Sequence, residues 1–462
     1  MASGINEWYR GRAVLVTGAC GLMGKVLIEK LLYSVPDIGC VYALVRSKRG
    51  KTPETRIEEM WKLPVSWTGK LEEKPHVMKK LVPVVGDISY DNLGIESKQL
   101  EKLSNEVSVI FHFAASLRLE APLLEGLEMN TKGTLRVLDV ARAMKKLDAF
   151  LHLSTAFCYP DYDKLAEQFR CDVDEVHDPP DNPHDVLRAA TWLTERQMEL
   201  LTPTIMGKHP NSYTYSKRLA ETLVKEAYPE LPACVVRPSI VTPAYKEPVA
   251  GWVDNLNGPI GLMVGAGKGV IRTMHCIGHY HAEVIPVDRA INAIIVIAKN
   301  VGSTVRSGDT KNTSWKEVLD IGKATVRKYP FEGPLWYPDG NLRHNKFIHN
   351  LCVFFYHIVP AYLIDFLMLI FMQKRFMVRI QNRITVGLEV LQYFTTREWW
   401  FDTDNFKGLV KTLNDTDADT YPMDLACIED GPYIETCMIG GKLYCMKEKL
   451  ENLPKARLQN NM

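Results

Sequence analysis

The sequence lacks an excess of charge of either sign. Its 56 Lys and Arg residues are balanced by 55 Asp and Glu residues, which leaves a formal net charge of +1. Proteins that bind nucleic acid use clustered positive charge to neutralise phosphate groups. We therefore expect no nucleic-acid partner.

Cysteine patterns of the kind that hold metals are also absent. The ten cysteines are scattered along the chain, without a CxxC pair and without a Cys/His cluster at zinc-ligand spacing. The first residues, MASGINEWYRGR, contain no apolar stretch of the kind found in secretory signal peptides. We predict no metal site, and we expect reduced thiols in a protein that faces the cytosol.

The composition that is present is typical of a globular protein. The chain has 462 residues, of which 46% are hydrophobic and 24% are charged, and this composition excludes a disordered or fibrous chain. The length favours two compact units. No internal repeat or low-complexity tract is visible in the sequence.

Short β-branched runs alternate with helical segments in the first 240 residues. The runs are almost continuously apolar, as expected for strands that are buried on both faces of a parallel sheet. We predict strands at Ala13–Ala19, Val41–Arg46, Leu81–Ile88, Val107–Ala115, Phe150–Thr155 and Ala233–Ile240, with helices at Lys25–Tyr33 and Leu123–Lys146. This alternation predicts an α/β fold built on a doubly wound parallel sheet.

A glycine-rich loop follows the first predicted strand and opens the next helix. It reads Thr17-Gly18-Ala19-Cys20-Gly21-Leu22-Met23-Gly24, with the glycines at GxxGxxG spacing. Gly18 permits a sharp turn, Gly21 lets the backbone approach a pyrophosphate, and Gly24 permits close packing of the helix on the sheet. The helix amino terminus then offers free N–H groups to the phosphates. In this context the loop predicts a Rossmann-like dinucleotide-binding site.

The second predicted strand indicates which dinucleotide is bound. NAD sites usually carry an acidic residue at this place, whereas this strand is followed by basic residues in the order Arg46, Ser47, Lys48 and Arg49. Arg46 and Lys48 suit the 2′-phosphate of NADPH. The alternative is a solvated basic loop. We predict NADPH as the cofactor.

Residues at the ends of the next two strands fit the adenosine half of the cofactor. Asp87, which is followed by Ile88, can accept a hydrogen bond from the adenine amino group. His112, Ala114 and Ala115 end the fourth strand and leave space for the adenosine.

Tyr213 and Lys217 are four residues apart at the start of a predicted helix, which places them on one helix face. A free tyrosine has a pKa of about 10, and we expect the neighbouring ammonium to lower the pKa of Tyr213 into a working range. Such a tyrosine can give a proton to a carbonyl oxygen while a hydride reaches the carbon. Ser154 or Thr155, at the end of the fifth strand, can hydrogen-bond the same oxygen.

Together these motifs resemble the extended short-chain dehydrogenase/reductase superfamily, and within it the fatty acyl-CoA reductases, particularly the moth pheromone-gland type. The resemblance covers nearly the whole chain. It is carried by TGxxGxxGK at Thr17–Lys25, AFLHLSTAF at Ala149–Phe157, YTYSKRLAE at Tyr213–Glu221, VRPSIV at Val236–Val241, GWVDNLNGP at Gly251–Pro259, EVIPVDRAINA at Glu283–Ala293 and YHIVPAYLID at Tyr356–Asp365. Cys20 stands where the family loop commonly has threonine, and many relatives carry a further hydrophobic helix beyond the region that matches Leu453–Met462.

The resemblance implies a reaction. A long-chain fatty acyl-CoA is reduced by two successive hydrides from NADPH to the primary alcohol, through an aldehyde and with release of CoA, in pheromone or other lipid biosynthesis. Two alternatives stay open. One is an extended reductase or dehydrogenase–isomerase that acts on a sterol or a nucleotide sugar, and the other is a noncatalytic NADP-binding sensor.

The resemblance also implies roles for individual residues. By position, Tyr213 matches the family's proton donor, Lys217 matches its partner, and Thr155, with Ser154 beside it, matches its hydroxyl group. Pro238 and Ser239 fall where the chain of the family passes the nicotinamide.

One segment, Phe347–Gln373, is far more apolar than the rest of the chain. It contains a single carboxylate, Asp365, and has Pro360 near its middle. Because proline interrupts helices, we expect Pro360 to split the segment into halves of about twelve residues, which are too short to span a bilayer. Its composition and its flanking cations predict contact with a membrane surface, and the alternative is a buried helix pair. The resemblance implies the cytosolic face of the endoplasmic reticulum.

We predict two domains. Residues 1–335 form the Rossmann-like NADPH-binding reductase domain with substrate-binding insertions, and residues 345–452 resemble the C-terminal male-sterility domain of the family. Within the second domain, Thr385–Leu450 is expected to form a small helical unit.

Two further features have open interpretations. The long connection between Thr155 and Tyr213 is acidic and rich in proline at its middle, and it predicts either a lid over the substrate or a surface excursion.

Lys268 and Arg272 can meet the phosphates of CoA or can lie on a solvated surface. The sequence leaves the oligomeric state and the preferred acyl chain length open.

Overall fold

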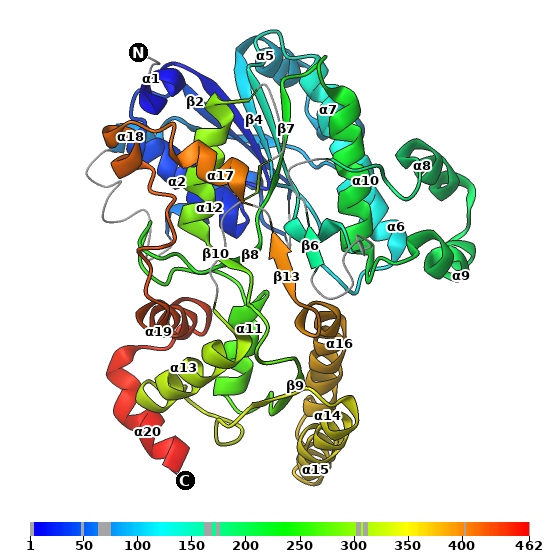
Figure 1. The fold of residues 1–462 in the computed structure, drawn as a ribbon, viewed down its shortest axis with the longest axis vertical. Helices are drawn as coiled ribbons and strands as arrows, with labels where there is room; N and C mark the ends of the chain where they lie inside the picture. The colour runs from blue at the N-terminus through cyan, green and yellow to red at the C-terminus, as the bar shows by residue number, and fades with distance from the viewer. Residues whose placement is uncertain are drawn as a thin grey trace.

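The computed structural model of the chain describes residues 4–47, 50–62, 75–160, 169–171, 176–301, 306–307, 313–401 and 403–461. Its centre is a seven-stranded sheet in which neighbouring strands are parallel (Figure 1). In spatial order the strands are β11 (Arg306–Ser307), β7 (Ala233–Arg237), β5 (Ala149–Leu153), β4 (Val107–His112), β1 (Ala13–Thr17), β2 (Cys40–Val45) and β3 (Leu81–Val85). The strand order reverses between β1 and β4, which is where ligands bind in doubly wound sheets.

The six predicted strands are confirmed, and each ends earlier than predicted at its carboxyl end. In β1 the cause is local, because Gly18 takes a φ of +71° that ends the extended conformation after Thr17. The two residues of β11 at the edge of the sheet were not predicted.

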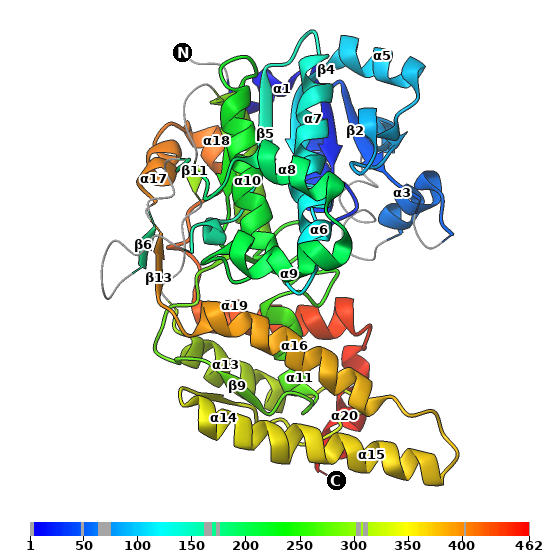
Figure 2. The same ribbon diagram turned by 90° about the vertical axis from the view of Figure 1, so that its right-hand side faces the viewer.

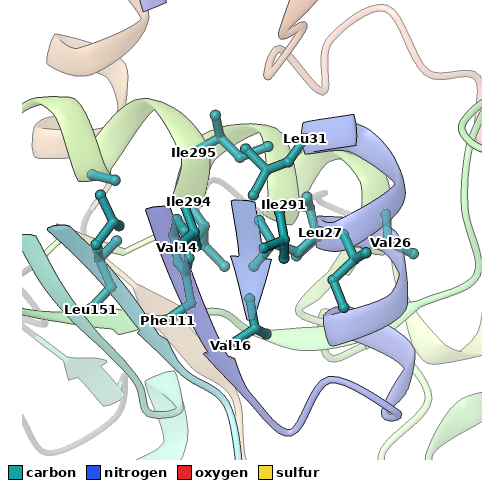
Figure 3. Close-up of a cluster of buried hydrophobic side chains, with 14 of the residues drawn as sticks. Val14, Val16, Val26, Leu27, Leu31, Phe111, Leu151, Ile291, Ile294 and Ile295 are labelled. Carbon is teal, nitrogen blue, oxygen red and sulfur yellow. The ribbon is translucent and has the colours of Figure 1, made fainter. Parts of the chain in front are cut away.

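Helices cover both faces of the sheet. One face carries α2 (Leu22–Ser34) and α12 (Val287–Lys299), and the other carries α5 (Ser97–Glu106), α7 (Gly133–Arg142) and α10 (Ser212–Ala227). Side chains alternate between the faces along each strand. Figure 3 shows the first of these two cores, in which residues of β1, β4 and β5 meet residues of α2 and α12, among them Val14, Phe111, Leu151, Leu27, Ile291, Ile294 and Ile295.

The predicted helix over Leu123–Lys146 is confirmed in three consecutive pieces, α6 (Leu123–Gly126), a π-helical turn η2 (Leu127–Lys132) and α7. It packs against α10. This contact fixes the position of the helix that carries Tyr213 and Lys217.

A second, mostly helical region lies below the sheet in Figure 1. It contains α11 (Pro259–Gly267), α13 (Trp315–Lys328), α19 (Asp430–Gly440) and α20 (Leu453–Asn461), together with the paired strands β9 (Thr273–His275) and β12 (Asn341–Arg343). Two further short pairs join β8 (Ile240–Thr242) to β10 (Val284–Pro286) and β6 (Phe169–Cys171) to β13 (Trp399–Phe401).

The segment Thr385–Leu450 is mostly helical, as expected, and part of it packs on the sheet region. Trp399–Phe401 is a strand, and the segment after it packs back on the α2–α12 layer of the sheet. There α17 (Asp404–Val410) and α18 (Asp415–Thr420) supply buried side chains, and Asp417 accepts a hydrogen bond from the backbone N–H of Ile5 at 3.1 Å. The local pattern did not show this packing, because apolar residues such as Phe406 and Tyr421 find their partners far away in the sequence.

The apolar segment differs from its prediction. Lys346–Ile370 is one continuous helix of 25 residues, made of α14 (Lys346–Val353), the π-helical turn η4 (Phe354–Ile358) and α15 (Val359–Ile370). The expected break at Pro360 is wrong. Proline has no N–H to donate to the preceding turn, and the wider turn η4 directly before it accommodates that loss without ending the helix.

A long helix, α16 (Met377–Thr395), packs against α15 and runs in the opposite direction (Figure 2). In Figure 2, α14 and α15 lie along the lower edge of the helical region, and α16 lies above them. Arg379 and Arg383 are exposed on α16.

Candidate active site

The glycine loop has the geometry of a phosphate cradle. A Cβ built on Gly18 would lie 2.7 Å from the carbonyl carbon of Phe113, and one built on Gly24 would lie 2.4 Å from the carbonyl oxygen of Gly18. Any side chain would therefore displace backbone at both positions. The loop leads directly into α2, whose amino terminus begins at Leu22. These residues fit a dinucleotide pyrophosphate.

Thr17 supports this loop from behind. Its hydroxyl is fully buried, accepts hydrogen bonds from the backbone N–H groups of Phe113 and Ala114 at 3.1 Å, and lies 2.8 Å from Nδ1 of His112. His112 in turn contacts the hydroxyl of Thr134 at 3.0 Å. Burial, with a smaller effect of Lys217, lowers the pKa of His112 to about 3, so this histidine stays neutral. Thr17 was predicted among the cofactor-binding residues, but it does not line the cleft.

One cleft gathers the other predicted residues. It has a cavity volume of about 590 Å³. Its lining includes these residues singled out from the sequence: Gly18, Cys20, Gly21, Leu22, Met23, Gly24, Arg46, Asp87, Ile88, Ala114, Ala115, Ser154, Thr155, Tyr213, Pro238 and Ser239. They follow the carboxyl ends of β1 to β5 and β7, or begin α10. Lys217 lies behind this lining, and Lys48 lies outside the described residues.

The basic end of the cleft contains a pair of arginines. Arg46 donates to Asp87 at 3.0 Å, and Arg56, on α3 (Pro53–Trp61), donates to the carbonyl oxygen of Arg46 at 2.8 Å. Burial alone would raise the pKa of Asp87, but hydrogen bonds from Ser89 and Arg46 hold it below its usual value. Asp87 is thus a charged acceptor at the predicted adenine end. The sequence analysis missed Arg56, because this residue lies on a helix and is ten residues beyond Arg46.

Thr155 and Tyr213 form the candidate reactive pair of the cleft. Thr155 lies close enough to the Tyr213 phenol to lower its pKa, and the two residues line the cleft from the end of β5 and the start of α10. Burial, helped by Cys158, raises the pKa of Tyr213, while Thr155 opposes this shift. The expectation that Lys217 lowers the pKa of Tyr213 is therefore wrong in this geometry, and the phenol stays protonated.

Lys217 contacts the backbone of β5. Its ammonium donates to the carbonyl oxygen of Leu153 at 2.6 Å, and its side chain is almost fully buried. Burial lowers the pKa of Lys217 to about 8, although Glu221 opposes that shift. Lys217 is thus held at the end of β5, the strand that leads directly to Thr155.

A buried charge network lies one helical turn beyond Lys217. Glu221 pairs with Arg237 of β7 through two contacts of 2.6 and 2.9 Å, and both side chains are fully buried. Tyr159 donates to Glu221 at 2.6 Å, and Ser154 is also hydrogen-bonded to Glu221. Ser154, whose hydroxyl lies 4.0 Å from the Sγ of Cys158, is next to this network. The sequence contained a signal for the position of Glu221, because Glu221 follows Lys217 by four residues and therefore lies on the same face of the helix.

The basic residues predicted as candidates for the CoA phosphates have protein partners. Lys268 donates to the carbonyl oxygen of Glu332 at 2.9 Å and to Glu448 at 3.0 Å. Arg272 donates to the carbonyl oxygen of Tyr337. Within the described part of the chain, no group of three His, Cys, Asp or Glu side chains is placed to hold a metal ion.

Two family models match the chain, and both are described as male sterility protein. The first, an NAD-binding model, covers residues 16–294, and the second covers residues 356–448. The chain is 34% identical to Fatty acyl-CoA reductase 1 of Gallus gallus over 466 residues, which covers 99% of this chain and 89% of the relative. It is 33% identical to Fatty acyl-CoA reductase 2 of Mus musculus over 468 residues, which covers 98% and 88%.

Solved structures share the fold at low sequence identity. The reductase domain of a nonribosomal peptide synthetase from Mycobacterium tuberculosis superposes with a TM-score of 0.63 at 18% identity, covering 94% of this chain and 92% of that one. The terminal reductase domain of the myxalamid pathway gives a TM-score of 0.58 at 18% identity, covering 95% and 92%. The Rossmann-like fold with a helical C-terminal region is thereby confirmed.

Proposed function

The chain belongs to the fatty acyl-CoA reductase family, and on that premise we propose how its site performs the reaction. The enzyme reduces a fatty acyl-CoA to the primary alcohol and releases CoA. For one acyl-CoA the balance is two hydrides and two protons taken up, with one alcohol and one CoA thiol formed. The fatty acyl-CoA reductases align with this chain over nearly its whole length. This similarity favours an acyl-CoA over a sterol or a nucleotide sugar as the substrate.

The observation that carries the mechanism is the Thr155–Tyr213 pair in the same cleft as the glycine cradle. When bound, NADPH supplies the hydride that attacks the carbonyl carbon. Tyr213 holds the proton that the carbonyl oxygen needs as charge develops on it, and Thr155 orients the phenol and the same oxygen. An intact proton donor argues against a noncatalytic sensor.

Lys217 acts on this pair from behind. Its ammonium donates to the carbonyl oxygen of Leu153 and so fixes the end of β5, which leads directly to Thr155. Pro238 and Ser239 line the cleft on the β7 side. We assign to them the wall beside the nicotinamide, and to Gly18, Gly21 and Gly24 the pyrophosphate.

The cofactor is NADPH rather than NADH in this proposal. Arg46 and Arg56 both line the adenosine end of the cleft, and two guanidinium groups there match a 2′-phosphate by charge and geometry. Asp87 is already paired with Arg46 and so is positioned for the adenine.

We also propose that the helix made of α14, η4 and α15, called the α14–α15 helix below, rests on a membrane surface. Its buried positions are His349, His357, Ala361 and Asp365. His349 lies 3.1 Å from the Thr273 hydroxyl, and His357 accepts a hydrogen bond from the backbone N–H of Arg272 at 2.8 Å. Its exposed positions are large and apolar, among them Phe347, Phe355, Tyr362, Leu363, Phe366 and Ile370.

This arrangement is the reverse of a helix on a water-facing surface, which buries its apolar residues and exposes its polar ones. After α15 the chain turns at Phe371 and Met372, and Met372 is 95% exposed. Lys374 and Arg375 follow directly and suit anionic lipid head groups. Because α16 returns alongside with exposed Arg379 and Arg383, a contact along the membrane plane fits better than a span.

A charge insertion tests the membrane contact. Replacing Leu367 and Ile370 together by Asp is expected to move the protein from the membrane pellet to the soluble fraction. The matched control replaces Leu200 and Leu201, which are exposed on α9 (Glu195–Met206), and is expected to leave the protein in the pellet. A folded Leu367/Ile370 variant that stays in the pellet after an alkaline carbonate wash contradicts the proposal.

Three finer assignments accompany the proposed membrane contact. We propose the cytosolic face of the endoplasmic reticulum with both chain ends in the cytosol, a role in pheromone or other lipid synthesis, and the division into residues 1–335 and 345–452. Glycosylation of Asn414 in cells would contradict the topology. Its side-chain amide donates to Asp417 at 2.9 Å and caps α18, so an attached sugar would also disturb that helix start.

The reaction itself is tested with purified protein, palmitoyl-CoA and NADPH. We expect hexadecanol to form with two NADPH consumed for each alcohol, and little turnover with NADH. Consumption of one NADPH with aldehyde as the final product would contradict the proposed route.

A further inference from the structure

The cleft continues past the reactive pair into an apolar space. Around Thr155 and Tyr213 its lining is polar, whereas farther on it is formed by side chains such as Ile260, Leu262 and Trp315. This second part of the cleft lies where the sheet region meets the helical region. A substrate that placed its carbonyl at Tyr213 would therefore extend toward α11 and α13.

A separate cavity opens behind this apolar wall. It has a volume of about 100 Å³ and lies among α11, α13, β9 and β12. Pro259, Leu262 and Trp315 line both the cleft and this cavity, so the two spaces are neighbours across these three residues. Val326 and Met438 are among the residues that line the cavity.

Three polar side chains of the cavity lining, those of Thr273, Lys323 and Asn341, have partners. The hydroxyl of Thr273 lies 3.1 Å from Nδ1 of His349. Lys323 donates to the side chain of Asn341 at 2.8 Å. The cavity thus presents apolar surface to an occupant, and nothing in its lining calls for a polar ligand.

The glycines around the cavity differ in what surrounds them. A Cβ on Gly265 or Gly267 of α11 would lie 2.6 Å from a side-chain carbon, so these glycines permit close packing. Gly322 is buried in the middle of α13 and lines the cavity, yet a Cβ built on it would meet no atom within 4 Å. A buried glycine inside a helix lowers helix stability and here leaves the space beside it unfilled.

We infer that this cavity receives the distal part of the acyl chain of the substrate, which enters past Leu262 and Trp315, and that Gly322 and Met438 set the length of chain that fits. This inference rests on the proposed function. Protein interiors are normally close-packed, and an apolar space that joins a reductase cleft suits methylene groups. Each methylene moved from water into such a space favours binding roughly fourfold.

Filling the cavity tests the inference. The experiment measures kcat/KM for lauroyl-, myristoyl-, palmitoyl- and stearoyl-CoA with wild type, Gly322→Leu and Met438→Ala. Gly322→Leu is expected to lower the ratio of stearoyl-CoA to lauroyl-CoA at least about tenfold, because its side chain takes the place of several methylenes. Met438→Ala is expected to raise the same ratio, since it enlarges the cavity.

The matched control is Gly408→Leu on α17, where a Cβ also meets no atom within 4 Å and the site is exposed. It is expected to leave the ratio at its wild-type value. Equal losses for all four substrates in Gly322→Leu, or an unchanged ratio in both cavity variants, would overturn the inference. If Gly322→Leu does not fold, Gly322→Ala and Met438→Ala still have to move the ratio in opposite directions. Wild-type protein that reduces none of the four acyl-CoAs would instead contradict the proposed function.

Discussion

The α12 helix and the α14–α15 helix are both rich in apolar residues, but their surroundings are opposite. Every residue of α12 from Val287 to Ala298 is buried between the sheet and its neighbours (Figure 3). Only 17% of an 18-residue stretch of the α14–α15 helix is buried by the described residues. Apolar composition alone therefore does not decide where a helix lies in this molecule.

The two helices share one device, which makes the difference clearer. Each carries a buried aspartate that accepts three backbone N–H groups from another segment. Asp288 of α12 accepts from Tyr245, Lys246 and Glu247 at 2.9, 2.9 and 3.2 Å. Asp365 of α15 accepts from Phe376, Met377 and Val378 at 3.0, 2.8 and 3.1 Å. The polar anchor is the same in both helices, so the contrast lies in what covers the apolar side chains.

The largest effect is expected when an isoleucine is replaced by aspartate in each of the two helices. Ile294 of α12 is 1% exposed and Ile370 of α15 is 58% exposed. Ile294→Asp is expected to destabilise the protein by more than about 4 kcal/mol, because it buries an unpaired charge. Ile370→Asp is expected to change stability by less than about 0.5 kcal/mol. Thermal unfolding in detergent measures both, and a comparable loss for Ile370→Asp would mean that α15 is covered by protein.

The next test asks whether catalysis can be lost while membrane binding is kept. Tyr213→Phe removes the proton donor and is expected to lower alcohol formation about 10²–10⁴-fold, while cofactor binding and the membrane-bound fraction stay near wild type. The control is Tyr215→Phe, two residues along α10, whose hydroxyl donates to Asp181 at 2.7 Å, and it is expected to remain active. More than a tenth of wild-type turnover in Tyr213→Phe would remove Tyr213 from the proposed mechanism.

A smaller effect is expected at the cofactor end of the sheet region. Arg46→Ala is expected to weaken NADPH binding by about 1.5–3 kcal/mol, the scale of a hydrogen bond to a charged group, and to leave NADH binding nearly unchanged. Arg56→Ala is expected to act in the same direction, since Arg56 lines the same end of the cleft. Titration of cofactor fluorescence measures both. Equal losses for NADPH and NADH would mean that Arg46 only holds Asp87.

The mildest effect is a change of rate with pH. The pKa of Lys217 is lowered to about 8 by burial, so the ammonium is present below that pH and is lost above it. We expect kcat/KM to fall by up to about tenfold for each pH unit above this value. Lys217→Arg keeps its charge to higher pH, so any activity it retains is expected to lose the alkaline fall. An alkaline limb that is unchanged in Lys217→Arg would assign it to another group. The membrane-bound fraction is expected to stay constant over the same range.

Local patterns were enough to predict most of the sheet and the residues of the cleft. The six long strands are read from runs of neighbouring apolar residues, and the glycine loop and the Tyr213–Lys217 spacing are each contained in a few consecutive positions. Arg56, Glu221 and Arg237 were missed as parts of the site. Their roles depend on which strand ends and helices meet in space.

The errors have the same origin. Pro360 was expected to break a helix, but the turn before it widened instead. Tyr213 was expected to have a lowered pKa because Lys217 is near it in sequence, whereas burial dominates and raises the pKa. In both cases a rule about neighbouring residues was overruled by the surroundings.

The sequence by itself determined the positions of the six long strands along the chain, the dinucleotide cradle, the family and its reaction, because each rests on residue types at short, regular spacing. Only the tertiary structure decided which residues surround Tyr213, which apolar helix is left uncovered and where a cavity neighbours the cleft. These features depend on contacts between residues far apart in the chain. The buried Glu221–Arg237 ion pair is one of them, because it joins α10 to β7, and no local pattern of residues contains that contact.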